Sequence, residues 1–479
     1  MLKIPTTFST RSFFLALTGL FVGVVHANNL HTNDHQDHQK LKVLIETDMG
    51  GDKDDQASFV RWLLYTCEWD VKGIVFDRAD DQFQRDPAAG NPSNALATME
   101  MAYDYLDAYT KVHDTLLKNN PDYPTAAYLK SVSVHGTNDS NAGRDLIIKA
   151  IDKTTMDAPI WYSNWGSNSG TRSNLRRALD YIQENRTDAE YKAFIAKLRI
   201  VTLDGQNTTR QGHQKNIPFH VEVGFPQLGD DIEGRWYRRF NDITATANGF
   251  DVNEDVLNNH GPLGKLYTGQ KEGDSWSFIY LIPTGLSDPN QPTWGGWAGR
   301  YGVRDGGSDV PHRAPFYWAN QEDTWNGSTN RDNCAQRFAV ALQNDFKARM
   351  DWCVLPFDRT NHPPVVFLQN DETTQVLTMD VEPGEKITLA ATAIDPDENP
   401  MAFTWWVYPE AGTYSGQIVL ENSDTNSINL IVPKDAAGTS IHLICEVTDS
   451  GIPALTRYRR AVIQCRKSSD GVNRSNNRF

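Results

Sequence analysis

Between Leu41 and about Val354, short runs of apolar residues alternate with longer stretches in which apolar residues recur every three or four positions. The short runs are typical of strands buried on both faces, and the longer spacing is typical of amphipathic helices. The predicted strands are residues 41–45, 71–76, 159–162, 198–203 and 278–283. The predicted helices are residues 59–64, 103–109, 142–151, 174–185 and 334–350. This alternation predicts an α/β fold, with a mainly parallel sheet flanked by helices.

After His362-Pro363-Pro364 the pattern changes to short strands in which apolar and polar residues alternate. These strands are residues 376–381, 386–393, 402–408, 427–432 and 441–447, and Trp405 and Trp406 are expected on opposite faces of a central strand. Turn clusters separate them about every 8–12 residues, which is typical of a β-sandwich. We interpret residues 395–400 as one of these turns, the alternative being a second Ca²⁺ site. The prediction is an α/β domain at 41–355 followed by an all-β sandwich at 362–466.

The first residues have the pattern of an export signal, in which Lys3 and Arg11 precede an apolar run that ends at Val25-His26-Ala27. We expect residues 1–27 to be the signal peptide, 28–40 a flexible leader and 467–479 a disordered tail. The apolar run is too short to span a membrane, and no later segment approaches about 20 apolar residues. The expected location is therefore secreted or periplasmic, without a membrane partner.

The net charge of −15 argues against binding a nucleic acid polymer through a basic face. Five cysteines in 479 residues are too few for a disulfide scaffold. In an oxidising compartment the two candidate bridges are Cys445 with Cys465 and Cys334 with Cys353. Cys67 is expected to be a buried free thiol.

An acidic turn follows the first predicted strand and leads into the first predicted helix. It contains Glu46, Asp48, Asp52, Asp54 and Asp55. Like charges this close repel one another, and a bound cation relieves the repulsion. Clustered carboxylate oxygens suit a hard ion such as Ca²⁺, whereas the alternative is a solvated turn whose aspartates cap the helix. The turn falls at the carboxyl end of a strand, where sheets of this kind carry their sites.

Four segments together resemble the nucleoside hydrolases, α/β enzymes that cleave the N-glycosidic bond of ribonucleosides with a water held by Ca²⁺. The segments are residues 46–55, 132–136, 163–174 and 271–282. The resemblance implies that Asp48, Asp55 and Asp274 hold Ca²⁺, and that Asp48 also takes a proton from the attacking water. Asp52 and Asp54 are then expected to support the cluster or to cap the helix.

The chain also departs from that family. Glu46 stands in place of an aspartate, and Gly273 stands where many members have the histidine near the leaving base. The family's Glu-x-Asn ribose segment has no counterpart. The candidates for the missing catalytic acid are His260 and His135, and the candidates for substrate binding are Asn164, Asn168 and His135; the alternative for each is a purely structural role.

A second resemblance spans nearly the whole chain after residue 27. Residues 47–56, 272–275, 280–285 and 294–301 are similar to secreted bacterial cellulose-binding proteins, which have a nucleoside-hydrolase-like domain and a C-terminal immunoglobulin-like domain. The implied partner is a sugar-containing small molecule or a polysaccharide, and a homo-oligomer is left open. The first hypothesis is a secreted Ca²⁺-dependent hydrolase that cleaves a glycosidic bond, N-ribosyl or other. The alternative is a non-catalytic carbohydrate (cellulose)-binding protein on the same scaffold.

Overall fold

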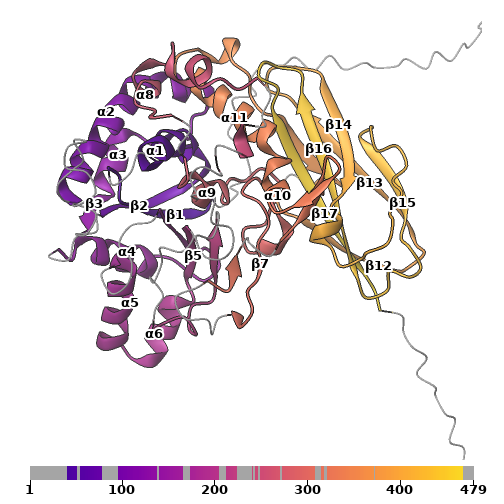
Figure 1. Ribbon diagram of the computed structural model, residues 1–479, viewed down its shortest axis with the longest axis horizontal. Helices are drawn as coiled ribbons and strands as arrows, with labels where there is room; N and C mark the ends of the chain where they lie inside the picture. Colours follow the sequence, from indigo (N-terminus) through magenta and orange to yellow (C-terminus); the bar gives the residue numbers. More distant parts are fainter. Residues whose placement is uncertain are drawn as a thin grey trace, which may run out of the picture. The chain divides into compact units, whose positions relative to one another are not determined.

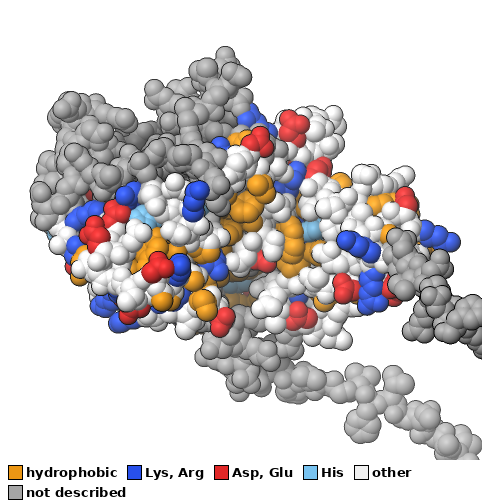
Figure 2. Space-filling view, turned by 90° about the horizontal axis from the view of Figure 1, so that it is seen from below, with side chains coloured by type: hydrophobic (Ala, Val, Ile, Leu, Met, Phe, Trp, Pro, Cys, Tyr) orange, Lys and Arg blue, Asp and Glu red, His pale blue; other side chains and the backbone are white. Residues whose placement is uncertain are grey.

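The computed structural model describes residues 40–50, 54–77, 95–136, 140–165, 173–203, 212–223, 240, 243–245, 249–269, 272–307, 314–317, 321–371 and 373–467. All of them belong to one compact unit that begins at Gln39. The predicted signal, the leader up to residue 39 and the tail from residue 468 lie outside them. Within these ranges no helix is long and apolar enough to cross a membrane. Acidic and basic side chains are interspersed over the described part of the face seen in Figure 2.

An eight-stranded sheet is the framework of the first part of the chain (Figure 1). Its strands are β1 (Lys42–Thr47), β2 (Asp70–Asp77), β3 (Ser133–Gly136), β4 (Ile160–Asn164), β5 (Leu198–Leu203), β6 (His220–Val223), β7 (Gly302–Val303) and β8 (Phe316–Tyr317). They lie in the order β3-β2-β1-β4-β5-β6-β8-β7, and only the edge strand β7 is antiparallel to its neighbour. The order runs outward from β1 in one direction and from β4 in the other. The carboxyl ends of β1 and β4 therefore flank the point where ligand sites of doubly wound sheets form.

Helices cover both faces of this sheet, as the sequence predicts (Figure 1). They are α1 (Asp54–Tyr65), α2 (Ala95–Asn119), α3 (Ala126–Ser131), α4 (Ala142–Asp152), α5 (Asn174–Asn185), α6 (Asp188–Ile195), α8 (Gly261–Gly264), α9 (Ser275–Ile279), α10 (Asn333–Gln336) and α11 (Ala339–Trp352). Short helical turns are η1 (Thr66–Glu68), η5 (Asn253–Leu257), η6 (Pro292–Trp294), η8 (Phe357–Arg359) and η9 (Pro409–Ala411). In β1, Val43 and Ile45 join the core formed with α1 and α2, whereas Leu44 joins the core formed with α4, α5 and α6. Successive side chains of a strand point to opposite faces of the sheet, so β1 contributes apolar side chains to both cores.

One strand prediction was wrong. Residues 278–283 are not a strand, because α9 (Ser275–Ile279) and the turn after it occupy this segment. Residues 278–282 are nevertheless buried and only Pro283 is exposed, so the apolar pattern predicted the burial correctly and the conformation wrongly. A short, fully buried helix has no polar face, and periodicity cannot separate it from a buried strand. The predicted helix at 334–350 is two helices, α10 and α11, which Arg337 and Phe338 separate.

Two sheets pack against each other in the C-terminal part and confirm the β-sandwich. The strands are β11 (Val365–Leu368), β12 (Leu377–Val381), β13 (Lys386–Ile394), β14 (Met401–Val407), β15 (Ser427–Ile431), β16 (Ser440–Asp449) and β17 (Thr456–Cys465). One sheet has the order β11-β13-β15 and the other β12-β17-β16-β14. Trp405 faces the core between the sheets and Trp406 packs on the core of the first part, but their strand lies at a sheet edge and not in the centre. The eight-stranded sheet and its helices end before residue 355, and the strands of the sandwich begin after residue 362. The exact domain boundaries, 355 and 362, stay predictions.

The two predicted disulfides are wrong, because all five cysteines are free. Cys445 lies opposite Arg459 in the β16–β17 pair, so Cys465 is six positions further along β17, roughly 20 Å away. Cys334 and Cys353 precede and follow α11, and a helix of 14 residues spans about 21 Å. Both separations exceed what a disulfide can bridge. Cys67 is a buried free thiol, as predicted.

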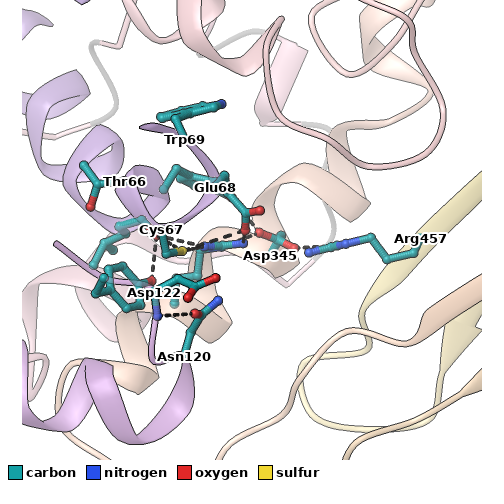
Figure 3. A network of polar contacts seen from close by, with 12 residues as sticks. Thr66, Cys67, Glu68, Trp69, Asn120, Asp122, Asp345 and Arg457 are labelled. Carbon is teal, nitrogen blue, oxygen red and sulfur yellow. Dashed lines mark hydrogen bonds and ion pairs between the residues drawn. The ribbon is translucent and has the colours of Figure 1, made fainter. Parts of the chain in front are cut away.

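A buried ion network joins the two parts of the chain (Figure 3). The carboxylate of Asp345 on α11 pairs with Arg349 of the same helix at 2.8 Å and with Arg457 of β17 at 2.7 Å. The hydroxyl of Tyr65 at the end of α1 donates a hydrogen bond of 2.8 Å to Asp345, and Arg349 also pairs with Glu68. One carboxylate therefore holds α1, α11 and the sandwich together.

Candidate metal centre

The carboxyl end of β1 begins with Glu46, a fully buried residue. The hydroxyl of Tyr162 on β4 donates a hydrogen bond to Glu46 Oε2, and Asn174 Nδ2 donates to Glu46 Oε1 over 3.2 Å. The same Asn174 nitrogen donates to Asp77 Oδ2, at the end of β2, over 3.0 Å. Burial raises the pKa of Tyr162 well above its ordinary value, and the nearby charge of Glu46 raises it further. Tyr162 is thus held as a neutral donor, and the longer reach of Glu46 is used for contacts to β4 and α5.

Two glycines make room for Asn174. A Cβ atom on Gly136, at the end of β3, would lie 2.3 Å from Asn174 Nδ2. A Cβ atom on Gly143, in the first turn of α4, would lie 2.6 Å from Asn174 Oδ1 and 3.0 Å from Val75. Real side chains do not tolerate such distances, so both positions need glycine if Asn174 is to bridge Glu46 and Asp77.

We expect Gly143→Ala to lower the free energy of unfolding by about 1–3 kcal/mol, because the new methyl group displaces Asn174. The sign is diagnostic, since Gly→Ala inside an open helix normally stabilises by up to about 1 kcal/mol. Urea unfolding followed by circular dichroism measures the change. The Gly143→Ala, Asn174→Ala double variant should lose less stability than the sum of the losses of the two single variants. Additive losses would show that the contact is unimportant.

The acidic cluster itself is formed by Asp54, Asp55 and Asp274. Asp54 and Asp55 open α1, and Asp274 is the residue that precedes α9. Their exposed fractions are 1%, 3% and 0%, and one oxygen of each lies within 4.8 Å of the others. Thr47, the last residue of β1, donates a hydrogen bond from its hydroxyl to Asp55 Oδ1. The cluster therefore lies at the carboxyl end of β1, where α1 begins.

A buried ion pair fixes Asp274 to α1. Two residues before Asp274, Glu272 pairs with Arg61 of α1, and both side chains are fully buried. Tyr267 donates a hydrogen bond to Glu272, and so does Ser275, whose hydroxyl also contacts Ser58 of α1 at 3.1 Å. The residues on both sides of Asp274 are thus tied to the helix that carries Asp54 and Asp55.

The three carboxylates fit a Ca²⁺ ion in ligand chemistry and in spacing. Ca²⁺ takes carboxylate oxygens at 2.3–2.6 Å, so two of its ligands can be at most about 5 Å apart. The spread of 4.8 Å in the cluster meets this limit. Three buried like charges also repel strongly in a medium of low dielectric constant, and a cation among them removes that cost. The donor set therefore suits a hard divalent ion.

The structure brings some of the predicted metal ligands together. Asp55 and Asp274 lie in the cluster, and Asp54, which was expected to have a supporting role, lies there with them. Asp48 follows directly after β1 and is 6% exposed, but it is not part of the group of three. Asp52 lies outside the described residues. The metal and proton-transfer roles of Asp48 stay predictions.

The predicted substrate and acid residues are more scattered. Asn164 ends β4 and donates a hydrogen bond of 3.1 Å to the hydroxyl of Tyr162, next to Glu46. His135 lies at the carboxyl end of β3, which is the outer neighbour of β2. His260 Nε2 lies 3.1 Å from Asp351 on α11. Earlier residues of α11 contact the last turn of α1, whereas the acidic cluster lies at the first turn of α1, so His260 is on the side away from the cluster. Asn168 lies outside the described residues.

Sequence reasoning missed two residues that organise this end of the sheet. Asn174 bridges two strands and Glu272 anchors the Asp274 segment, yet both were considered only as parts of longer motifs. Both stand among polar neighbours, Arg172-Ser173 before Asn174 and Gln270-Lys271 before Glu272, so no local pattern marks them. Their partners lie on other elements, so the sequence alone could not pair them.

The chain therefore combines a doubly wound α/β domain, which has buried carboxylates at the switch point of its sheet, with a β-sandwich. Residues 42–301 match the family model described as "Cellulose-binding Sde182, nucleoside hydrolase-like domain". Residues 386–465 match the model described as "Cellulose-binding protein Sde0182, C-terminal domain". The first match covers more than half of the chain, so the chain belongs to this family, as its motifs predicted.

Among solved structures, the chain is similar to a nucleoside hydrolase-related hypothetical protein from Saccharophagus degradans, described as associated with carbohydrate metabolism. The two are 29% identical with a TM-score of 0.70, and the match covers 89% of this chain and 100% of the other. Human CDH23 EC21-23 matches at 16% identity over 21% of this chain and 33% of that chain, with a TM-score of 0.17. No curated protein matches the chain.

Proposed function

We propose that the chain is a secreted Ca²⁺-dependent hydrolase that cleaves a glycosidic bond, either N-ribosyl or another glycosyl linkage. The observation that carries this proposal is the buried group of Asp54, Asp55 and Asp274 at the switch point of the sheet. Membership of a family with a nucleoside hydrolase-like domain supports the same reaction class. Three buried carboxylates are costly to a fold, which favours a functional reason for keeping them.

In the proposed mechanism Asp54, Asp55 and Asp274 hold the ion. When bound, Ca²⁺ supplies positive charge that lowers the pKa of a neighbouring water and orients it. Asp48, at the end of β1, is the proposed base that accepts the proton of this water while the sugar carbon develops oxocarbenium character. Asn164 is the proposed donor to a sugar hydroxyl, because it ends the strand next to β1.

The proposed mechanism has no clear residue that protonates the leaving group. His260 was one candidate acid, but its contact with Asp351 on α11 supports a structural role. The other, His135, lies on β3, which β2 separates from β1. Without an acid, a leaving group must depart as an anion, which is fast only when that anion is stable. We therefore expect activity first on substrates with good leaving groups, such as nitrophenyl glycosides or purine ribosides.

A second candidate function is recognition of a polysaccharide without cleavage. It is favoured by the words "cellulose-binding" in the descriptions of both matching family models. In that case the acidic cluster orders the scaffold, and Ca²⁺ affects stability and binding but yields no product.

The test is metal-dependent turnover by the chain from residue 28 onward, after removal of metal with EDTA. We expect product from at least one ribonucleoside, nitrophenyl glycoside or cello-oligosaccharide only when Ca²⁺ is restored. Asp55→Asn and Asp274→Asn should each lower kcat/KM by more than about 100-fold, because they remove direct ligands. The matched control is Asp188→Asn, which alters an exposed ion pair on α6 and should leave activity unchanged.

Two outcomes would reject the enzyme. One is no Ca²⁺-dependent product from any substrate. The other is turnover that survives both cluster substitutions. Retention of the intact chain on cellulose without product would favour the second candidate, and the same assay on Asp274→Asn tells whether the cluster contributes to binding.

A further inference from the structure

Three segments converge at one end of the sandwich. They are residues 360–364, which lead from η8 into β11, residues 395–400 between β13 and β14, and residues 449–455, which run from the last residue of β16 to the start of β17. The strand register sets this convergence, because Val365 pairs with Ile394 and Met401 pairs with Asp449. Polar residues from each segment therefore meet at the junction with the α/β part.

Asp449 uses only one of its two carboxylate oxygens for hydrogen bonds. Its Oδ1 accepts from Asn361 Nδ2 at 2.9 Å, from the Gly451 nitrogen at 2.9 Å and from the Leu455 nitrogen at 3.0 Å. Its Oδ2 is buried and has no hydrogen-bond partner among the described residues. The whole residue is 4% exposed, so water does not readily solvate that second oxygen.

Asp395 repeats the same pattern. Its Oδ1 accepts from the backbone nitrogens of Asp397 at 3.0 Å and Asn399 at 2.8 Å. Its Oδ2 is buried and also lacks a hydrogen-bond partner in the described part of the chain, and the residue is 7% exposed. Buried polar atoms are almost always paired, so two bare carboxylate oxygens at one junction require an explanation.

The two carboxylates are close enough to act on each other. Burial raises the pKa of Asp449, and the charge of Asp395 raises it further, against the hydrogen bonds from Leu455, Asn361 and Gly451 that lower it. The side chains of Asn361 and Asn399 link the pair: Asn399 Nδ2 donates to Asn361 Oδ1 at 3.0 Å, and Asn361 in turn donates to Asp449.

The surrounding backbone is built closely around this group. A Cβ atom on Gly451 would lie 2.1 Å from Asn361 Oδ1, so only glycine lets the amide reach Asp449. Asp397, the second aspartate of residues 395–400, is committed elsewhere: it accepts from the backbone nitrogen of His362 at 2.6 Å and lies 2.9 Å from the His362 ring. Glu398 is exposed. Two carboxylates and neighbouring amide oxygens remain, which are ligands that Ca²⁺ prefers.

We propose that Asp395 and Asp449, together with amide oxygens of Asn361 and Asn399, bind one Ca²⁺ ion at this junction. The site is separate from the Asp54–Asp55–Asp274 cluster and does not depend on the proposed function. Its role is to fix the segment between the two parts of the chain. The carbonyl of Asn361 accepts from Trp352 Nε1 of α11 at 3.0 Å, so an ion that orders Asn361 also orders the contact with α11.

The experiment counts Ca²⁺ bound to the chain from residue 28 onward, by equilibrium dialysis and elemental analysis after removal of metal. We expect Asp449→Asn to lower the count by one ion per chain, whatever the α/β cluster binds. Asp274→Asn should lower the count independently, and the two losses should add in the double variant. The control Asp380→Asn, at an exposed position on β12, should leave the count unchanged.

The substitution is designed so that the variant folds. Asparagine keeps the oxygen that accepts the three hydrogen bonds, and its nitrogen offers a donor in place of the bare oxygen. Asp449→Asn should therefore melt no lower than the wild type in EDTA. Ca²⁺ in hundredfold excess over Kd should raise the Tm of Asp274→Asn by about 3 °C and leave the Asp274→Asn, Asp449→Asn variant unmoved.

Two results would overturn the proposal. One is a Ca²⁺ count that Asp449→Asn does not change. The other is a junction that responds to pH alone: wild-type Tm in EDTA rises as the pH falls towards 5, while Ca²⁺ at pH 7 has no effect on Asp274→Asn. That second result would mean that the two carboxylates share a proton in place of an ion.

Discussion

Asp345→Asn is expected to lower the free energy of unfolding by about 3–5 kcal/mol, the typical cost of removing one partner from a buried ion network. Asp345 is 2% exposed, and its carboxylate pairs with Arg457 (Figure 3). It also pairs with Arg349 and accepts a hydrogen bond from Tyr65. Asparagine is nearly isosteric, so packing is preserved and the loss is electrostatic. Urea unfolding monitored by tryptophan fluorescence and circular dichroism gives the value.

The pH dependence gives an independent measure of the same network. Burial alone would raise the pKa of Asp345, but the charges of Arg457 and Arg349 outweigh it and hold the pKa well below its usual range. The stabilisation is therefore present above the unfolded pKa of about 3.9 and is lost as the pH falls below it. Between about pH 4 and pH 2 the wild type should lose more stability than Asp345→Asn.

The control for Asp345 is Asp188→Asn, which breaks an exposed ion pair with Lys192 on α6. Such pairs contribute about 0–1 kcal/mol, so its effect should be small. A loss below about 1 kcal/mol for Asp345→Asn would mean that the network does not hold the two parts of the chain together.

Arg61→Met is the second substitution with a large expected effect, again a loss of about 3–5 kcal/mol. The guanidinium lies 3.7 Å from the ring centroid of Phe346 and pairs with Glu272, and neither charged side chain is exposed. Methionine retains much of the apolar contact but leaves the Glu272 charge buried without its counterion. Chemical denaturation measures the change in stability.

The pair also positions a candidate metal ligand, which gives a second readout. Because Glu272 lies two residues before Asp274, Arg61→Met should weaken Ca²⁺ binding at the cluster by about 10–100-fold, as outer-sphere substitutions do. Adding Glu272→Gln removes the stranded charge and should recover more than half of the lost stability. Equal stability of the single and double variants would contradict the assignment of the loss to that charge.

Much of the fold was predictable because strand and helix periodicities are local properties. The α/β class and the sandwich are confirmed, and the strands at 71–76 and 198–203 lie within one residue of β2 and β5. The failure at 278–283 came from burial on every side, which erases the polar face that marks a helix. The disulfide prediction failed because spacing along the sequence says nothing about separation across a sheet or along a helix.

The candidate site was predictable only in part. Asp55 and Asp274 could be paired through the order of motifs, and the structure places both in one cluster. The sequence did not predict that Asp54 joins Asp55 and Asp274 in the cluster. That depends on which side chains of the first turn of α1 point towards α9, which the sequence does not give. The bridging role of Asn174 depends on two glycines from different elements, a coincidence that exists only after folding.

The pair of Arg61 and Glu272 joins residues 211 positions apart. The acidic cluster depends on the same closure, so it cannot assemble from any short fragment of the chain. A contact of such long range costs the entropy of closing the chain between its two residues, which slows its formation. A cation bound there would stabilise the completed α/β part and not its precursors.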